Sequence, residues 1–343
     1  MKKKRLWALG LIIGVIVMLP ALPFKAVRAA HAQQGKLPDH LVLASRGKVL
    51  PRQIALAAHC EKHLGIPVIY SETGGSIVTI SKMQKGKADF CGIGDRDIYR
   101  AWRGTGEFKD AGKMDFRIMW YEEPGYMFSF VTVPRTGIKS IKDLAGKKVA
   151  FRERRAKVVE EMAAAILEYY GLLAKVAEVP PLTRAEKAGA LAEGRVDVTF
   201  DESMTLPMIQ QHNPGAFYLD IPREAGEYMR KKYPYLSWHA LPAKYMGLDV
   251  ITEGMGFVTQ LPIHICRTTL NDYTVYQIVK CVYENLDELI AAEPYFRLKT
   301  LNAAVCPKAN APYHPGAIRY WRDRGVWGSE MDAVQKNLLA IRK

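Results

Sequence analysis

Cysteine is scarce in this sequence, and its spacing excludes the common cysteine-based sites. The 343 residues contain five cysteines and no CxxC pair, which argues against a zinc ribbon or a thioredoxin-like redox centre. Because five is an odd number, at least one thiol is unpaired. We interpret most of the cysteines as small apolar core residues. A disulfide among Cys266, Cys281 and Cys306 is the alternative in an oxidising compartment.

Enzyme motifs are also missing. The sequence has no GxSxG nucleophile elbow, no HExxH motif, no Walker A loop and no GxGxxG fingerprint followed by an acidic ribose partner. Eight histidines are dispersed along the chain, and the closest pair, His59 and His63, has metal-binding spacing but no third ligand that we expect nearby. We therefore expect no catalytic residues, no metal and no other cofactor.

Basic residues outnumber acidic ones, 49 to 35, but they do not gather into a nucleic-acid-binding pattern. There is no basic stripe interleaved with aromatic residues, no RNP-like strand and no zinc-finger spacing. Six of the Lys and Arg residues lie within residues 1–32, so the net charge falls from +14 to +8 without that segment. We expect no nucleic-acid partner.

Long hydrophobic runs are limited to the N-terminus, which has the three parts of an export signal. Lys2–Arg5 is basic, and Leu6–Leu19 is uncharged but shorter than the roughly 20 residues of a membrane span. Small residues then flank a cleavage point after Ala32. We predict that residues 1–32 are removed and that the mature chain is periplasmic. No cysteine for a lipid anchor is near the cut, and an uncleaved signal anchor is the alternative.

The length and the hydrophobic pattern predict two α/β lobes, because the chain is too long for one compact core. From Leu41 onward, short apolar runs alternate with amphipathic helical windows, which is typical of mostly parallel sheets. The pattern at Ile80–Ile93 returns at Ala185–Phe200, which indicates two similar halves. The β-rich passages 127–133 and 256–265 are predicted to cross between the lobes. Lobe I is then 33–130 and 257–343, lobe II is 131–256, and the ligand cleft lies between them.

Basic residues follow predicted strands in both halves. Guanidinium groups hold carboxylates bidentately and helix N-termini favour anions, so two such loops facing one cleft predict an acidic ligand. The alternative is a pair of solvated charged loops. The candidate ligand-binding residues are Ser45, Arg46 and Lys48 in the first half, and Arg152, Arg154 and Arg155 in the second.

Three further groups are candidates for the same cleft. A glycine turn at a helix start, whose free N–H groups can hold an anion or simply cap the helix, consists of Thr73, Gly74, Gly75 and Ser76. Arg96 follows another predicted strand and would add to the basic lining. Asp201 and Glu202 follow the strand Val198–Phe200 and could meet an ammonium group, a cation, or Arg154 or Arg155. We favour pairing with the arginines.

Several segments, spread over nearly the whole mature chain, together resemble one known family. They are Thr73–Ser76, Lys85–Phe90, Gly104–Phe108, Gly137–Val149, Glu284–Leu289 and His314–Trp321. The chain resembles the TAXI-type solute receptors of TRAP transporters. The resemblance implies an α/β, two-lobed periplasmic binding protein of type II-like fold, with mixed sheets flanked by helices and a central cleft that closes by hinge bending.

The resemblance also implies a function. Such a receptor binds a glutamate-like amino acid or a dicarboxylate and delivers it to its membrane partner, a TRAP permease driven by an ion gradient. We expect the receptor to be a monomer. Tyr121 matches the family's strand end before the first crossing, as a cleft aromatic or a core residue.

The two basic loops depart from the family, whose members carry neutral Gly, Ser and Thr residues there. We therefore hypothesise a ligand with more negative charge, a di- or tricarboxylate or an acidic amino acid, with Asp201 and Glu202 orienting the arginines. A receptor for an ABC permease or a sensor kinase, with the same fold, is the alternative. An exported enzyme is a third, against which stands the lack of a nucleophile with a positioned base.

Overall fold

The computed structural model describes residues 35–46, 50–122, 125–152, 157–177, 179–202, 205–298 and 301–341. The predicted export signal at 1–32, and the candidates Lys48, Arg154 and Arg155, lie outside these residues. Within the described ranges, no helix combines the length and the apolarity needed to cross a bilayer.

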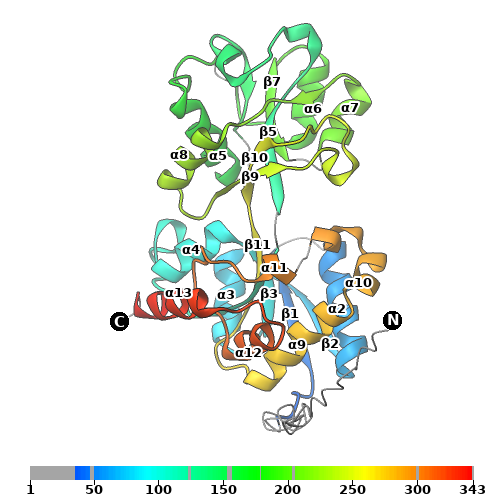
Figure 1. The fold of residues 1–343 in the computed structure, drawn as a ribbon, viewed down its shortest axis with the longest axis vertical. Helices are drawn as coiled ribbons and strands as arrows, with labels where there is room; N and C mark the ends of the chain where they lie inside the picture. The colour runs from blue at the N-terminus through cyan, green and yellow to red at the C-terminus, as the bar shows by residue number, and fades with distance from the viewer. Residues whose placement is uncertain are drawn as a thin grey trace, which may run out of the picture. The chain divides into compact units, whose positions relative to one another are not determined.

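The first sheet has the strand order β2-β1-β3-β11-β4 (Figure 1). Strands β1, β2 and β3 are parallel, and β11 runs antiparallel to both β3 and β4. The strands are β1 (Leu41–Ser45), β2 (Val68–Glu72), β3 (Phe90–Gly94), β4 (Arg117–Tyr121) and β11 (Pro262–Cys266). The helices of this lobe are α2 (Pro51–Leu64), α3 (Ser76–Gln84), α4 (Asp95–Arg103), α9 (Asp272–Glu284), α10 (Leu286–Ala292), α11 (Leu301–Ala304), α12 (Pro315–Asp323) and α13 (Ser329–Ala340).

The second sheet has the order β6-β7-β5-β10-β9, with β8 paired to β5. Strands β6 and β7 are parallel, and the other pairs are antiparallel. The strands are β5 (Tyr126–Thr132), β6 (Val149–Ala150), β7 (Val198–Glu202), β8 (Phe217–Tyr218), β9 (Ser237–Leu241) and β10 (Met255–Gln260). The helices are α5 (Lys157–Tyr169), α6 (Arg184–Ala192), α7 (Leu206–His212) and α8 (Arg223–Lys232).

The chain changes sheet between β4 and β5 and again between β10 and β11 (Figure 1). Only Leu261 separates β10 from β11. The sequence placed the lobe boundaries at 130/131 and 256/257, which are positions inside β5 and β10. The apolar pattern continues through these strands of the second sheet, so it does not reveal the short breaks at which the chain passes between sheets.

The predicted repeat of helix, turn and strand is present in both lobes, as α3–β3 and α6–β7. In each unit an aspartate before the strand accepts a hydrogen bond from the backbone of the neighbouring parallel strand. Asp89 Oδ2 accepts from the N–H of Val42 at 2.7 Å, and Asp197 Oδ2 accepts from the N–H of Lys148 at 2.9 Å. The same hydrogen bond from a backbone N–H to an aspartate thus recurs at equivalent positions of the two sheets.

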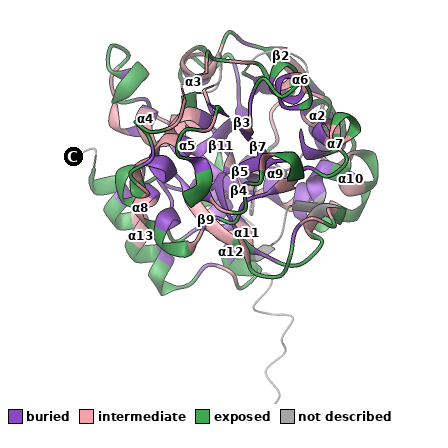
Figure 2. Cartoon of the chain, turned by 90° about the horizontal axis from the view of Figure 1, so that it is seen from above, coloured by how far each residue is buried: buried purple, intermediate pink, exposed green. Residues whose placement is uncertain are grey.

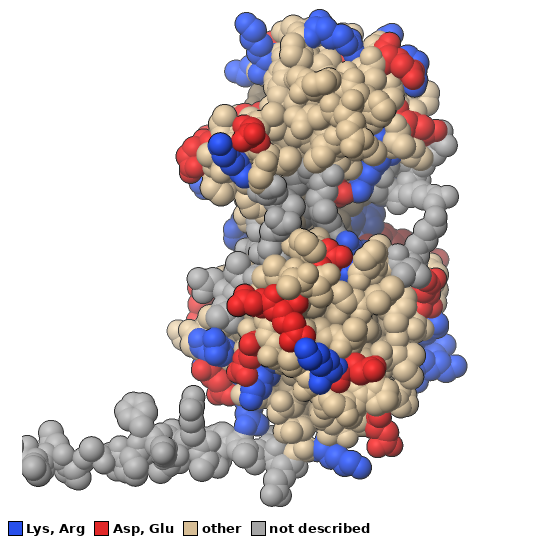
Figure 3. Space-filling view, turned by 90° about the vertical axis from the view of Figure 1, so that its right-hand side faces the viewer, with Lys and Arg blue, Asp and Glu red and all other residues tan. Residues whose placement is uncertain are grey.

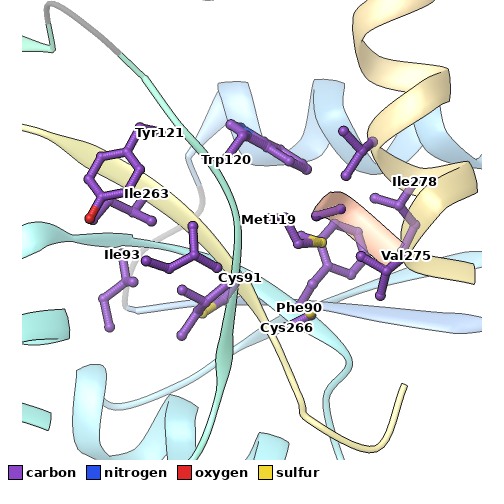
Figure 4. Packing of buried hydrophobic residues seen from close by; sticks show 14 of the residues in the cluster. Phe90, Cys91, Ile93, Met119, Trp120, Tyr121, Ile263, Cys266, Val275 and Ile278 are labelled. Atoms are coloured by element: carbon purple, nitrogen blue, oxygen red, sulfur yellow. The ribbon is translucent and has the colours of Figure 1, made fainter. Parts of the chain in front are cut away.

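Each sheet buries its own apolar core, and the buried segments follow the strands and the inward helix faces (Figure 2). In the first lobe, Val275 and Ile278 of α9 pack toward Phe90 and Met119 of the sheet (Figure 4). All five cysteines are buried and free, which confirms their interpretation as core residues and excludes the disulfide among Cys266, Cys281 and Cys306 from this structure.

Candidate functional site

A cavity of about 390 Å³ opens in the first lobe. It lies at the carboxyl ends of the parallel strands β1 and β3, where α/β proteins commonly hold ligands. The loop after β2 also borders it, through Gly75 and Ser76. The remaining wall includes Gln260, Leu261 and Pro262, which form the crossing from β10 to β11. A ligand in this cavity would therefore touch one of the two connections between the sheets.

Three helices begin at the cavity. Arg52 and Gln53 are in the first turn of α2, Gly75 and Ser76 start α3, and Gly94 is the residue before α4. Pro51 occupies the first position of α2, which fixes the start of that helix. Gly75, the N-cap of α3, has a φ of +126° and no side chain with which to cap the first-turn N–H groups. These N–H groups and the helix dipoles favour an anion.

Two arginines line the cavity. Arg46 donates to Asp97 Oδ2 at 3.0 Å and to Ser76 Oγ at 3.4 Å, so its guanidinium is held in one orientation although 38% of the side chain is exposed. The guanidinium of Arg52 lies 4.8 Å from the centre of the Tyr295 ring. Both cations are thus positioned by partners on other segments before any ligand arrives.

Glu122 and His264 form the polar part of the wall near the crossing. His264 Nδ1 lies 3.2 Å from Glu122 Oε1, and both side chains are about 2% exposed. Tyr295 donates to Glu122 Oε2 at 3.1 Å, and the Trp120 ring stacks on His264 with 4.5 Å between ring centres. A buried carboxylate is thereby held by a histidine and a tyrosine beside the cavity.

Glycines and a free hydroxyl keep the cavity open and polar. A side chain at Gly94 would displace the end of the Gln260 side chain, and one at Gly92 would press on the ends of Gln53 and His264, so the two glycines leave room for these polar groups at the cavity. Ser45 Oγ is buried and has no hydrogen-bond partner among the described residues. Because Ser45 lines the cavity, its hydroxyl is available to a ligand.

The structure brings several predicted site residues together in the first lobe. Ser45, Arg46, Gly75 and Ser76 line the cavity. Gly74 lies in an adjoining hollow bordered by Gly75 and Ser76. Thr73 stands behind the wall: its hydroxyl donates to the backbone oxygen of Ser45 at 2.8 Å. Thr73 therefore positions the end of β1 instead of facing the cavity.

Arg96 does not line the cavity, which corrects its interpretation as a residue of the basic lining. It is 12% exposed, and its Nε donates to Glu161 Oε2 at 3.0 Å. Glu107 and Asp97 accept from its Nη1. Three carboxylates thus surround this guanidinium, which leaves it no free face for a ligand anion.

Tyr121 is a core residue in this structure and not a cleft aromatic. Its side chain is fully buried (Figure 4) and its hydroxyl accepts a hydrogen bond from the N–H of Asn310 at 3.1 Å. Burial raises the pKa of Tyr121 well above its usual value, with a further contribution from the charge of Asp95. The tyrosine fixes the segment around Asn310 against the end of β4.

The three described candidates of the second lobe lie outside the cavity. Arg152 is 40% exposed, and its Nε is 3.8 Å from Glu160 Oε1. Asp201 and Glu202 belong to β7 and do not follow it as predicted. Glu202 pairs with Arg184 of α6. The arginines Arg154 and Arg155, which the sequence suggested as partners of the acidic pair, lie outside the described residues.

Lys187 of α6 is a residue that sequence analysis missed. Its side chain is fully buried, its Nζ donates to the backbone oxygen of Phe200 at 2.9 Å, and it lies 3.6 Å from Asp201 Oδ1. The acidic residue at the end of β7 thus meets a lysine of its own lobe. A lysine in an Ala-rich helix carries no sequence signal for burial.

Other cavity residues were missed although the sequence holds signals for some of them. Pro51 is a typical first residue of a helix, and this signal would have placed Arg52 and Gln53 at a helix N-terminus. The alternating glycines of β3, Gly92 and Gly94, are typical of a strand that another group approaches closely. Glu122 and His264 carry no such signal, because their proximity depends on the pairing of β4 with β11.

The charges of the surface are mixed. On the face shown in Figure 3, Lys and Arg side chains are interspersed with Asp and Glu, and large uncharged areas separate them. That face has no continuous basic surface of the kind that follows a nucleic-acid backbone.

Comparison with known proteins gives a family match and several similar solved structures. Residues 49–325 match the model of the NMT1-like family. Similar solved structures include the periplasmic aliphatic sulphonate binding protein SsuA from Escherichia coli, with 15% identity, 88% of this chain and 86% of that chain covered, and a TM-score of 0.46. PhnD1 from Prochlorococcus marinus in complex with methylphosphonate has 10% identity, coverages of 75% and 90%, and a TM-score of 0.47.

The L-cystine solute receptor of Neisseria gonorrhoeae is a third similar structure, with 15% identity, coverages of 76% and 93%, and a TM-score of 0.42. The two mixed sheets with flanking helices, joined by two crossings, are the α/β architecture that the resemblance implied. The match is to the NMT1-like family, and membership of the TAXI family is not shown.

Proposed function

The chain belongs to the NMT1-like family, and from this premise we propose that it is a solute-binding protein without enzymatic activity. Its ligand is a small anionic solute, bound in the cavity of the first lobe and passed to a membrane permease. We place this step in the periplasm, in keeping with the export signal predicted at the N-terminus. The cavity of about 390 Å³ has the size of a site for a small molecule.

The observation that carries the proposal is the convergence of positive groups on the cavity. Three helix N-termini and two arginine side chains face one space. Oriented donors of this kind bind carboxylate, sulfonate or phosphonate oxygens, and guanidinium groups can do so bidentately. The arrangement has no nucleophile with a positioned base, so it supports binding without turnover.

The number of cavity charges favours one anionic group over the di- or tricarboxylate of our sequence-based hypothesis. Arg46 and Arg52 are the basic side chains of the described wall apart from His264, and Glu122 is its acidic side chain. Asp97 already binds Arg46, and Arg96 is enclosed by carboxylates. We therefore propose a solute with one carboxylate, sulfonate or phosphonate head group and a short uncharged body.

Ligand contact with the crossing provides a route from binding to closure. Gln260, Leu261 and Pro262 line the cavity and connect the two sheets. A solute that touches them favours whichever hinge angle gives it the most contacts. Of the predicted basic residues of the second lobe, Arg152 is the one among the described residues, and closure of the lobes would bring it into contact with the solute.

Screening by thermal shift, followed by calorimetry, tests the binding proposal. A monoanionic carboxylate, sulfonate or phosphonate is expected to raise the melting temperature, since a hundredfold excess over Kd adds about 2.7 kcal/mol of stability. Arg46→Gln and Arg52→Gln are each expected to weaken binding by about 10- to 100-fold, because a hydrogen bond to a charged group contributes about 1.5–3 kcal/mol.

Two control variants sharpen this experiment. Arg322→Gln removes an exposed arginine that pairs with Asp332 on the surface, and its affinity is expected to equal that of the parent protein. Arg152→Gln reports on closure, because it weakens binding only if the second lobe reaches the solute. Binding that survives both Arg46→Gln and Arg52→Gln, or a screen in which only neutral or cationic solutes bind, would contradict the proposal.

The permease is proposed to belong to the ABC class, the alternative that the sequence left open. The family match gives no support to the TRAP class that the resemblance implied. In cells that contain the receptor and its permease, uptake of the solute is expected to stop when ATP is depleted while the ion gradient is maintained. Uptake that instead follows the ion gradient at low ATP would contradict the ABC class and support the TRAP class.

A further inference from the structure

The second half of α2 carries two histidines that face α10, a helix that packs against it (Figure 1). His59 and His63 are one helical turn apart, with 4.5 Å between their ring centres. Glu288, in the first turn of α10, places its Oε2 3.1 Å from His63 Nε2. The structure thus supplies a third ligand from another helix, which corrects the expectation that no such ligand lies nearby.

We propose that His59, His63 and Glu288 bind a divalent transition-metal ion such as Zn²⁺. One ligand atom from each residue lies within 4.8 Å of the others. Around a tetrahedral Zn²⁺ the donors are about 3.3 Å apart, so small rotations of the half-buried His63 and the exposed Glu288 complete the site. Two imidazoles and a carboxylate, with one position open to water, are a donor set that zinc proteins use.

The groups behind these side chains match those around known metal ligands. His59 Nε2 is 3.1 Å from the backbone oxygen of Cys281, which orients the ring and leaves Nδ1 for the metal. Lys62 donates to Glu288 Oε1 at 2.6 Å, so the two carboxylate oxygens have separate partners. Metal-ligating histidines and carboxylates usually have such second hydrogen bonds.

A metal ion at this site would restrain α2, the helix that carries part of the cavity wall. Arg52 and Gln53 are in the first turn of α2, and the histidines are in its second half. A metal ion between α2 and α10 links the two helices at one end of α2 and restrains the helix whose other end lines the cavity.

Calorimetry with ZnCl₂ on the tag-free full chain, stripped with a chelator, tests the site. One Zn²⁺ per chain is expected. His63→Gln and Glu288→Gln are each expected to weaken binding at least tenfold. Co²⁺ is expected to give the intense visible absorption of a four-coordinate ion in the parent protein and to lose it in both weakened variants.

His212→Gln is the matched control, because His212 is an exposed histidine at the end of α7. Its zinc affinity is expected to equal that of the parent protein. His63 and Glu288 are both partly exposed, so their variants are expected to keep the far-UV circular dichroism of the folded chain. Zinc affinity that is equal in the parent protein and in the His63→Gln, Glu288→Gln double variant would overturn the site, as would the absence of zinc binding in the parent protein.

Discussion

Replacing Glu161 with glutamine is expected to lower the free energy of unfolding by about 2–3 kcal/mol, between the small effect of an exposed ion pair and the 3–5 kcal/mol of a fully buried one. Glu161 belongs to α5 of the second lobe and accepts hydrogen bonds from α4 of the first. Arg96 Nε donates at 3.0 Å and Arg100 Nη2 at 2.8 Å. Tyr235 donates to the same carboxylate at 2.9 Å.

The physical reason is that both guanidinium groups depend on this carboxylate. Arg96, Arg100 and Glu161 are only 12%, 19% and 16% exposed, so water screens them weakly. Burial alone would lower the pKa of Arg100, but the hydrogen bond to Glu107 and the charge of Glu161 raise it. A neutral glutamine would leave two adjacent cations that share Glu107 as their principal counter-ion.

Urea unfolding of Glu161→Gln and Glu160→Gln measures this effect against a neighbour on the same helix. Glu160 pairs with Lys157 and Arg152 near the surface, so its loss is expected to change stability by less than about 0.5 kcal/mol. Because the Glu161 contacts join helices of the two lobes, Glu161→Gln is also expected to raise the radius of gyration of the ligand-free protein in X-ray scattering. Equal stabilities of the two variants would mean that the network contributes no more than a surface pair.

The elements of the fold were predictable because their signals are local. The capping box of Ser140 and Asp143 forms as its sequence suggests. Asp89 and Asp197 occupy equivalent turns in the two repeats, and each bonds to the adjacent parallel strand. Where the prediction differed, a local detail decided the outcome. The helical pattern of residues 271–292 reads as one helix, but the chain divides it at Asn285 into α9 and α10, and Glu288 of α10 contacts α2.

The candidate site was only partly predictable, because contacts between distant segments decide which charges are free. Arg46 and Arg96 both follow strands of the first sheet, and sequence analysis treated them alike. Arg46 remains at the cavity, whereas Arg96 meets Glu161, 65 residues away. The partner is on the other lobe, and the hydrophobic pattern of α5 gives no information about which glutamate faces α4.

The segment His314–Trp321, which carried much of the family resemblance, has a structural role in this fold. His314 is the N-cap of α12: its Nδ1 accepts from the N–H of Gly316 at 3.1 Å, and its Nε2 is 2.9 Å from the backbone oxygen of Leu270. Pro315 occupies the first helical position, and a side chain at Gly316 would overlap the backbone of Asp272. The motif therefore fixes the start of a helix, and it is not part of the cavity wall described above.

Stability is expected to fall by about 3 kcal/mol between pH 7 and pH 4 because of His314. Burial lowers the pKa of His314 from 6.5 to about 4, and the nearby charge of Asp272 opposes this only in part. Each pKa unit corresponds to about 1.36 kcal/mol. The Gly316 N–H occupies Nδ1, so protonation of the folded state would break the N-cap.

The sign follows from which state binds the proton first. The unfolded chain takes up a proton as the pH falls through about 6.5, whereas the folded chain resists until about pH 4. The unfolded state therefore binds more protons in this window, and the free energy of unfolding decreases as the pH falls. At pH 7 the folded state is neutral at this residue and the unfolded state is mostly neutral, so its depressed pKa has little effect on stability there.

Urea unfolding of the parent protein and of His314→Asn, measured from pH 7 to pH 4, isolates this contribution. Asparagine also caps helices well but does not titrate, so the variant is expected to lose about 1 kcal/mol at pH 7 and to show a pH dependence smaller by about 3 kcal/mol. His239, whose pKa burial also lowers to about 4, contributes to both proteins and cancels in the difference. His212→Asn, at an exposed position, is expected to retain the parent's slope. Parallel pH profiles for the parent protein and His314→Asn would show that His314 is protonated in the folded state, and that the bond from Gly316 does not set its charge.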